Sequence, residues 1–202
     1  MASHAEGFKT FAEYRYSHAE GNNTRAVGHS AHAEGFLTTA SGRYSHAEGN
    51  AVSALSSAAH AEGYLTTASG RYSHAEGNAV SVLADGAHAE GFRTTASGRY
   101  SHAEGNSAEA TGDHSHASGY LTKARGKASF AAGYMSEADA SAENAFVIGR
   151  YSKAEGPAGS NSFVWQGVPS GTVFYNSNSK GSFNVNPQNG LSGFYIGKSN
   201  FI

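Results

Sequence analysis

The sequence predicts an all-β protein, a narrow parallel β-roll whose chain winds through fourteen-residue coils. The tetrapeptide His-Ala-Glu-Gly begins at every fourteenth residue, eight times, from His4 to His102. Alanine occupies every seventh position from Ala5 to Ala145, with Val82 as the one exception. The 202 residues include 26 glycines but only 29 Leu, Ile, Val and Phe, about 14%, which is too few for a thick core. A thin, repetitive solenoid satisfies all three observations.

Each coil is predicted to contain two strands of about five residues, each ended by a glycine turn. Side chains alternate along a strand, so the middle alanine points inward and its two neighbours point outward. Glycine supplies the backbone freedom of a tight corner. So short a coil is narrow enough that only small inward side chains fit, and Val82 should be its tightest point. Two altered copies, at His116 and Phe130, extend the roll to about ten coils and a first domain of residues 1–145.

A helical heptad is the alternative explanation for alanine at every seventh residue. Glycine would then occupy one heptad position in most repeats, at a cost of about 1 kcal/mol each. This cost favours the β-roll.

The outward residues of the first half-coil stay constant along the rod, whereas those of the second half-coil vary. A constant face meets the same surroundings at each level, and another copy of the chain is the simplest such surrounding. One narrow roll also buries little apolar surface, so association would supply the missing burial. We therefore expect a homo-oligomer. The predicted interface comprises His4, Glu6, His18, Glu20, His32, Glu34, His46, Glu48, His60, Glu62, His74, Glu76, His88, Glu90, His102 and Glu104.

The pattern of a small residue, alanine and glycine, repeated at this spacing, resembles the head repeats of YadA-like trimeric autotransporter adhesins. The segment 144–149, Asn-Ala-Phe-Val-Ile-Gly, is close to that family's Asn-Ser-Val-Ala-Ile-Gly motif. Similar His-Ala-Glu-Gly arrays occur in phage tail-appendage proteins. The resemblance implies a homotrimer of left-handed rolls that mediates attachment, outside a bacterial cell or on a virion appendage. His and Glu stand where the adhesin motif has aliphatic residues, which indicates a polar interface.

The repeated His and Glu residues suggest either a structural ladder or a metal site. An active site needs one unique constellation, and an identical pair on every coil does not provide one, so we predict no catalytic residue, no cofactor and no enzymatic activity. Threefold symmetry could bring three histidines together, which makes His18, His46, His74 and His102 the candidate metal ligands. We also hypothesise that Glu of one chain accepts a hydrogen bond from His of its neighbour, which raises the pKa of that His if burial does not reverse the effect.

A second period, twice the length of a coil, places aromatic side chains on alternate coils. Arg-Tyr pairs at Arg15-Tyr16, Arg43-Tyr44, Arg71-Tyr72 and Arg99-Tyr100 alternate with Phe8, Phe36, Tyr64, Phe92 and Tyr120. These residues either cover the edges of the roll or form an aromatic ladder for a carbohydrate. Tyr44, Tyr72 and Tyr100 are therefore candidate receptor contacts. Threonines at 38, 66 and 94 do not recur on every coil, which argues against ice binding.

Composition changes after residue 145. Residues 146–202 hold 15 of the 29 Leu, Ile, Val and Phe, all three prolines and the only tryptophan. Short apolar runs between Gly, Ser and Asn turns predict a β-rich C-terminal cap or collar, which a solenoid needs at its open end. Trp165, Phe194 and Tyr195 in this segment are further candidate receptor contacts.

Charge and hydropathy exclude other classes of function. The net charge of −2 and the lack of a basic run argue against nucleic-acid binding. No apolar run approaches the roughly 18 residues of a membrane span. We expect a non-enzymatic trimeric fibre or head domain that binds itself and a surface receptor, either a glycan or an extracellular protein. An inert fibre spacer and a metal-binding His and Glu assembly are the alternatives.

Overall fold

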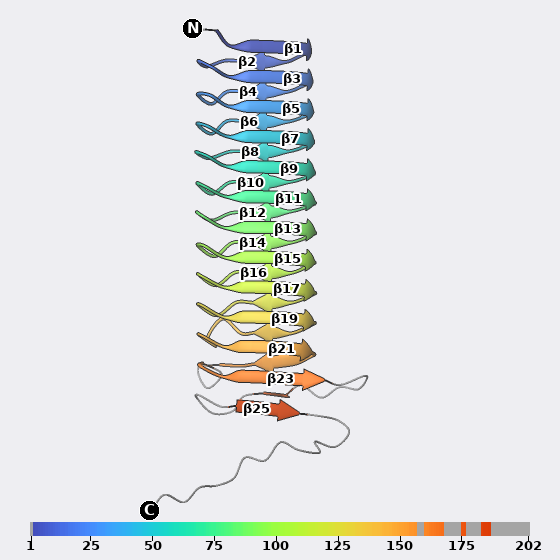
Figure 1. Ribbon diagram of the computed structural model, residues 1–202, viewed down its shortest axis with the longest axis vertical. Helices are drawn as coiled ribbons and strands as arrows, with labels where there is room; N and C mark the ends of the chain where they lie inside the picture. The colour runs from blue at the N-terminus through green and yellow to red at the C-terminus, as the bar shows by residue number, and fades with distance from the viewer. Residues whose placement is uncertain (1, 157–159, 168–174, 177–182, 187–202) are drawn as a thin grey trace, which may run out of the picture.

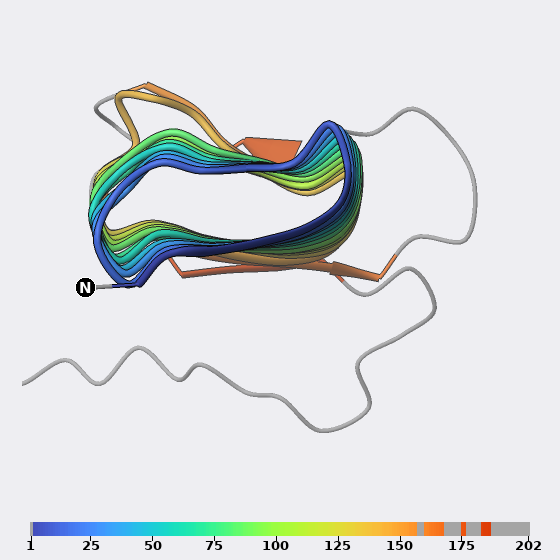
Figure 2. The ribbon, with the colours of Figure 1, turned by 90° about the horizontal axis from the view of Figure 1, so that it is seen from above.

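The fold is a parallel β-solenoid, seen in a computed structural model that describes residues 2–156, 160–167, 175–176 and 183–186. No helix occurs in these residues. The chain winds in successive coils from the N-terminus at the top of Figure 1 downward, and the coils follow nearly the same path when viewed along the rod in Figure 2. The prediction of a narrow all-β roll is confirmed, and its regular coils have the predicted length.

Two parallel sheets form the long sides of the roll. The first sheet contains β1 (His4–Phe8), β3 (His18–Asn22), β5 (His32–Phe36), β7 (His46–Asn50), β9 (His60–Tyr64), β11 (His74–Asn78), β13 (His88–Phe92), β15 (His102–Asn106), β17 (His116–Tyr120), β19 (Phe130–Tyr134), β21 (Phe146–Arg150), β23 (Phe163–Gly167) and β25 (Phe183–Asn186).

The second sheet is built from much shorter strands. It contains β2 (Phe11–Ala12), β4 (Arg25–Ala26), β6 (Thr39–Ala40), β8 (Ser53–Ala54), β10 (Thr67–Ala68), β12 (Ser81–Val82), β14 (Thr95–Ala96), β16 (Glu109–Ala110), β18 (Lys123–Ala124), β20 (Glu137–Ala138), β22 (Ser152–Ala154) and β24 (Tyr175–Asn176). The prediction of two equal strands per coil is therefore wrong. The remaining residues of the second half-coil form the corner that leads back to the first sheet.

The interior is a column of small side chains, as the seven-residue period predicts. Ala61 and Ala68, the inward residues of two successive strands, are fully buried, and so is Val82. Thr66 lies inside as well, at a position that holds Val52 and Val80 in the adjacent coils. Identical residues pair in register from coil to coil, for example His60 with His74. The first sheet therefore presents one unbroken column of each outward residue.

Glycines of the second half-coil, such as Gly42, lie at the predicted corner, but those of the first half-coil have a different role from the predicted one. Gly63 lies within β9 rather than at a corner, with φ of 115°, and a Cβ there would lie 2.1 Å from the carbonyl oxygen of Gly77 in the next coil. The left-handed corner positions hold other residues, such as Leu65 and Tyr72, with φ of 54° and 56°. Glycine is required because the backbones of adjacent coils approach closely, not because the chain turns there.

The roll continues past residue 145 after one longer coil. His116 pairs with Phe130, the regular spacing, but Phe130 then pairs with Phe146, so this coil contains two extra residues. Ala145, which the seven-residue period counts as an inward strand residue, instead precedes β21 and is buried beside it. The strands β21, β23 and β25 extend the first sheet. The division into domains at residues 145 and 146 stays a prediction.

Candidate functional site

The predicted interface residues form a ladder on the outer face of the first sheet. His is the first and Glu the third residue of each long strand, so both side chains point outward on either side of a buried alanine. From His18 to His102 the imidazole rings of neighbouring coils stack with centroids 4.6–4.9 Å apart. We call this face, from His4 to His116 together with its glutamates, the polar ladder.

Each histidine of the polar ladder from His4 to His102 contacts the glutamate of its own strand. The distances between His Nε2 and Glu Oε2 run from 3.3 Å at His46 and Glu48 to 3.9 Å at His102 and Glu104. Both side chains keep roughly a third to a half of their surface exposed in the single chain, except at the more exposed first coil. In the single chain each of these histidines already has a glutamate partner in its own strand. A contact with Glu of a neighbouring chain would therefore be made in addition to this one or in its place.

Burial and stacking lower the pKa of two ladder histidines in the single chain, whereas the hypothesised rise concerns a glutamate of a neighbouring chain. Desolvation is the largest cause of the lower pKa of His88, and the neighbouring His102 and His74 add to it. Desolvation and His102 likewise lower the pKa of His116, against the opposing effect of Glu104. In the single chain, the nearby glutamates do not outweigh the loss of hydration and the repulsion between stacked rings.

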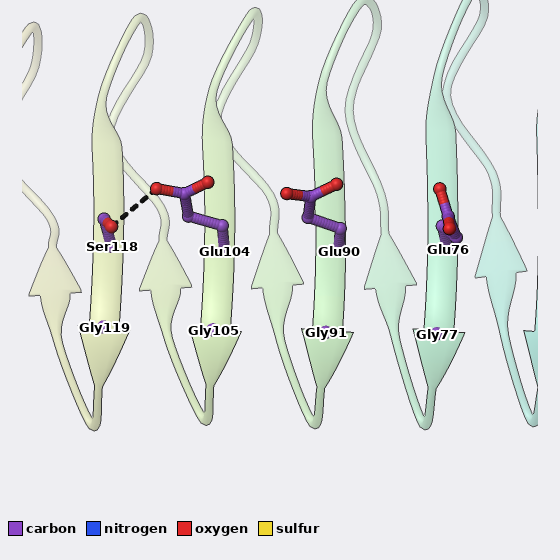
Figure 3. Close-up of a pocket in the computed structure, with 8 residues that line it drawn as sticks. All are labelled: Glu76, Gly77, Glu90, Gly91, Glu104, Gly105, Ser118 and Gly119. Carbon is purple, nitrogen blue, oxygen red and sulfur yellow. Dashed lines mark hydrogen bonds between the residues drawn. The ribbon is translucent and has the colours of Figure 1, made fainter.

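The polar ladder ends where Ser118 replaces glutamate. Ser118 Oγ donates a 2.6 Å hydrogen bond to Glu104 Oε1, which lowers the pKa of that carboxyl (Figure 3). His116 also approaches Glu104 Oε1, at 3.7 Å. These contacts hold the last carboxylate of the ladder toward the C-terminal end of the rod.

A shallow groove of about 470 Å³ runs beside the last glutamates of the ladder. Each lining glutamate is followed along its strand by a glycine, which adds no side chain to the groove (Figure 3). The lining residues are Glu76, Gly77, Glu90, Gly91, Glu104, Gly105, Ser118 and Gly119.

One group in the described part of the chain has the donor set of a metal site. Glu90, His102 and Glu104 offer ligand atoms that all lie within 4.8 Å of one another. Imidazole and carboxylate donors suit zinc and other divalent transition metals. Of the four histidines predicted as candidate ligands, only His102 belongs to this group. Within the described residues, His18, His46 and His74 each contact a single carboxylate, that of their own strand.

Beyond the polar ladder the same face becomes apolar. Phe130, Phe146 and Phe163 continue the histidine column, with ring centroids 4.6 and 5.4 Å apart. Ile148 and Trp165 continue the glutamate column, because β19, β21 and β23 pair in register. We call these five residues the apolar ladder. The fourteen-residue period does not reveal the apolar ladder, because the two extra residues before Phe146 break the regular count. The likeness of Phe-Ala-Ala-Gly to Phe-Val-Ile-Gly is the signal in the sequence that points to it.

The predicted receptor contacts fall in two different places. Tyr44, Tyr72 and Tyr100 lie at one corner of successive alternate coils and are 57, 74 and 63% exposed. Trp165 lies instead in the apolar ladder, in register with Ile148, and is 38% exposed. Phe194 and Tyr195 lie outside the described residues.

A search of the described residues for membrane spans found no helix that is both long and apolar enough to cross a bilayer.

One short part of the roll matches a known family of repeats. A family model for the YadA head domain repeat matches residues 110–136, in two copies. No curated protein matches the chain. The matched residues belong to a stack whose other coils share their strands and register. Repeats of this family form a structural, adhesin-type fold rather than a family of enzymes. Residues 110–136 of the β-solenoid are therefore similar to YadA head domain repeats.

Proposed function

We propose that the chain is a non-enzymatic, homotrimeric fibre or head domain that attaches a bacterial surface or a virion appendage to a target surface. Three left-handed rolls would lie side by side with the outer faces of their first sheets turned toward one another. The observation that carries this proposal is that one face of the roll keeps the same residues, in register, over eight coils, while the opposite face varies.

The apolar ladder supports association through this face. Threefold symmetry places each coil against the same coil of a neighbour through a heterologous contact, so apolar coils meet apolar coils and polar coils meet polar coils. Phe146 and Trp165 are 39 and 38% exposed in one chain, and their burial between chains is favourable. Stacked glutamates repel, by about 1 kcal/mol per pair in water at a spacing of about 4.8 Å. The apolar ladder therefore supplies the affinity in this arrangement, and the polar ladder sets the alignment of the chains.

Light scattering on the purified chain tests the trimer. We expect a mass three times that of the 20.9 kDa chain, unchanged by a chelator. A monomer at every concentration would overturn the proposal, and loss of the trimer with the chelator would favour the alternative of a metal-loaded assembly.

Two double variants test the division between the ladders. The double variant Phe146→His and Ile148→Glu gives this coil the outward residues of a polar coil. The fold should persist, but the trimer should dissociate at a higher protein concentration than the wild-type trimer does. The converse change, His60→Phe with Glu62→Ile, adds an apolar coil in the middle of the polar ladder and should tighten the trimer. Equal trimer stability in all three proteins would show that this face is not the interface.

A further inference from the structure

Arginine and tyrosine recur together at one corner of the roll. Tyr16, Tyr44, Tyr72 and Tyr100 occupy the same corner of alternate coils, and each directly follows an arginine. Coils that pair as parallel strands lie about 4.8 Å apart, so successive tyrosines are separated by about 9.6 Å. The corner is thus a straight row of four identical aromatic and cationic units along the rod.

The fold does not require tyrosine at this corner. The equivalent position holds Ser30, Ala58 and Gly86 in the coils between. The four tyrosines adopt φ of 54–63°, a left-handed conformation that is unfavourable for a bulky residue. They are also 57–74% exposed, so they contribute little buried surface. A side chain that stays strained and exposed at four repeated positions indicates a role in binding rather than in folding.

The charge along the corner is uneven. Arg71 is held by Asp85 through hydrogen bonds of 3.0 Å from Nε and 2.6 Å from Nη2. In the part of the chain that the structure describes, the guanidinium groups of Arg15 and Arg43 have no carboxylate within 4 Å. Arg43 instead lies over the ring of Tyr44, 4.8 Å from its centroid. The guanidinium group of Arg99 likewise has no carboxylate within 4 Å in the described residues, so the row offers three guanidinium groups that are free to bind an anion.

We propose that this corner binds a linear acidic polysaccharide along the rod. Tyrosine rings pack against the apolar faces of sugar rings, and a spacing of about 9.6 Å requires a ligand that repeats along its length. Guanidinium groups bind carboxylate or sulfate oxygens through paired hydrogen bonds, and Arg15, Arg43 and Arg99 supply them. The inference rests on the proposed attachment function and specifies the chemistry of its receptor.

Isothermal titration calorimetry on the full chain tests the proposal with defined probes. The probes are polygalacturonate oligomers, heparin oligomers, an uncharged β-glucan of the same length and single-stranded DNA of the same charge. We expect at least one acidic polysaccharide to bind, more tightly than the β-glucan and the DNA, with an affinity that falls as salt rises.

Two variants and one matched control locate the site. The double variant Tyr44→Ala and Tyr72→Ala places alanine where the intervening coil already has Ala58, so the fold should tolerate it. Binding should weaken about tenfold or more. Arg43→Ser introduces the residue that the next coil has at the equivalent position, Ser57. This variant should bind the acidic polysaccharide more weakly, and its binding should depend less on salt. The control Tyr64→Asn removes an exposed aromatic side chain at a strand end, away from the proposed site. Asn50 and Asn78 occupy this position in the adjacent coils, so asparagine fits there, and binding should be unchanged.

Several results would overturn the inference. They are the absence of binding to both acidic polysaccharides, an equal loss of binding in Tyr64→Asn, or equally tight binding of the DNA, which would indicate a general stacking surface for polyanions. Light scattering on each variant separates the two proposals. A trimer that binds no polysaccharide overturns this inference alone, whereas a monomer overturns the proposed assembly.

Discussion

Single residues set how closely the coils stack. Gly63 shows this most directly, because its φ of 115° is unfavourable for other residues and the carbonyl oxygen of Gly77 occupies the place of a Cβ. The same arrangement recurs at the fourth position of the long strands, for example at Gly49 and Gly77. The fold depends on this column of glycines as much as on the column of alanines inside the roll.

Replacing Gly63→Ala should therefore destabilise the protein by about 3 kcal/mol or more, because it combines backbone strain with a clash against backbone atoms. Chemical denaturation measures this change. The matched control is Gly86→Ala, a corner where Ala58 already stands and where the added Cβ would meet only the movable ring of Tyr100. That variant should lose about 1 kcal/mol or less. Equal losses would show that close backbone approach is not the reason for Gly63.

Buried hydroxyl groups are a second feature at the residue scale. Thr66 Oγ1 is fully buried and makes no hydrogen bond to a protein group in the described residues, and Thr24, Thr38, Thr94 and Thr122 share this property. Val52 and Val80 occupy the same position in the coils on either side of Thr66. A valine therefore fits this space.

We expect Thr66→Val to stabilise the fold by about 1 kcal/mol, since it removes a buried polar group without a partner. The melting temperature should rise accordingly. Thr67→Val, one residue along on the outward face, is the control and should change stability by less than about 0.5 kcal/mol. A loss of stability in Thr66→Val would mean that the hydroxyl is satisfied inside the roll.

At the scale of the element, the long strands of the first sheet make a continuous stack of imidazole rings. The lowered pKa of His88 means that the unfolded chain binds a proton more readily than the folded chain. The stability that comes from the neutral ring is present above the unfolded pKa of about 6.5 and is lost as pH falls below it. The stack should therefore be sensitive to acid, the opposite of the behaviour expected from a histidine whose pKa is raised.

The variant His88→Phe should lose less stability than the wild type between pH 7.5 and pH 5. Phenylalanine fits the stack, because Phe130 lies against His116 with centroids 5.0 Å apart. The reverse change, Phe130→His, should increase the loss. Thermal unfolding at the two pH values measures both effects. A wild-type protein that becomes more stable at pH 5 would contradict the lowered pKa of His88 and His116.

At the scale of the whole molecule, the single coil is the unit that can be added or removed. Deleting residues 46–59 joins Ser45 to His60 and keeps every long strand in register with its neighbours. The shortened protein should fold cooperatively, and small-angle scattering should show a rod about 4.8 Å shorter. Deleting only residues 46–52 sets a short strand against a long one. This variant should unfold at a much lower temperature, and equal stability of the two deletions would mean that register is not required.

The period of the sequence determined a large part of this architecture by itself. Coil length, the inward alanines and the constant outward pair of His and Glu all follow from spacing, because a solenoid places residues one coil apart directly above one another. For the same reason the sequence predicted which residues gather on one face. The positions of the long strands from His18 to His102 could be predicted from the sequence alone, because their repeat is exact.

Only the tertiary structure decided the features that depend on contacts between coils. It placed the glycines of the first half-coil within strands, because their need arises from the distance between two backbones rather than from local turn propensity. It decided the direction of the pKa shift of His88 in the single chain, since burial and the neighbouring rings outweigh a nearby carboxylate. It also carried the face of the polar ladder onward through Phe146 and Trp165, across a longer coil that breaks the linear period. Spacing along the chain specifies position, whereas close approach, burial and register across an insertion are properties of the packed coils.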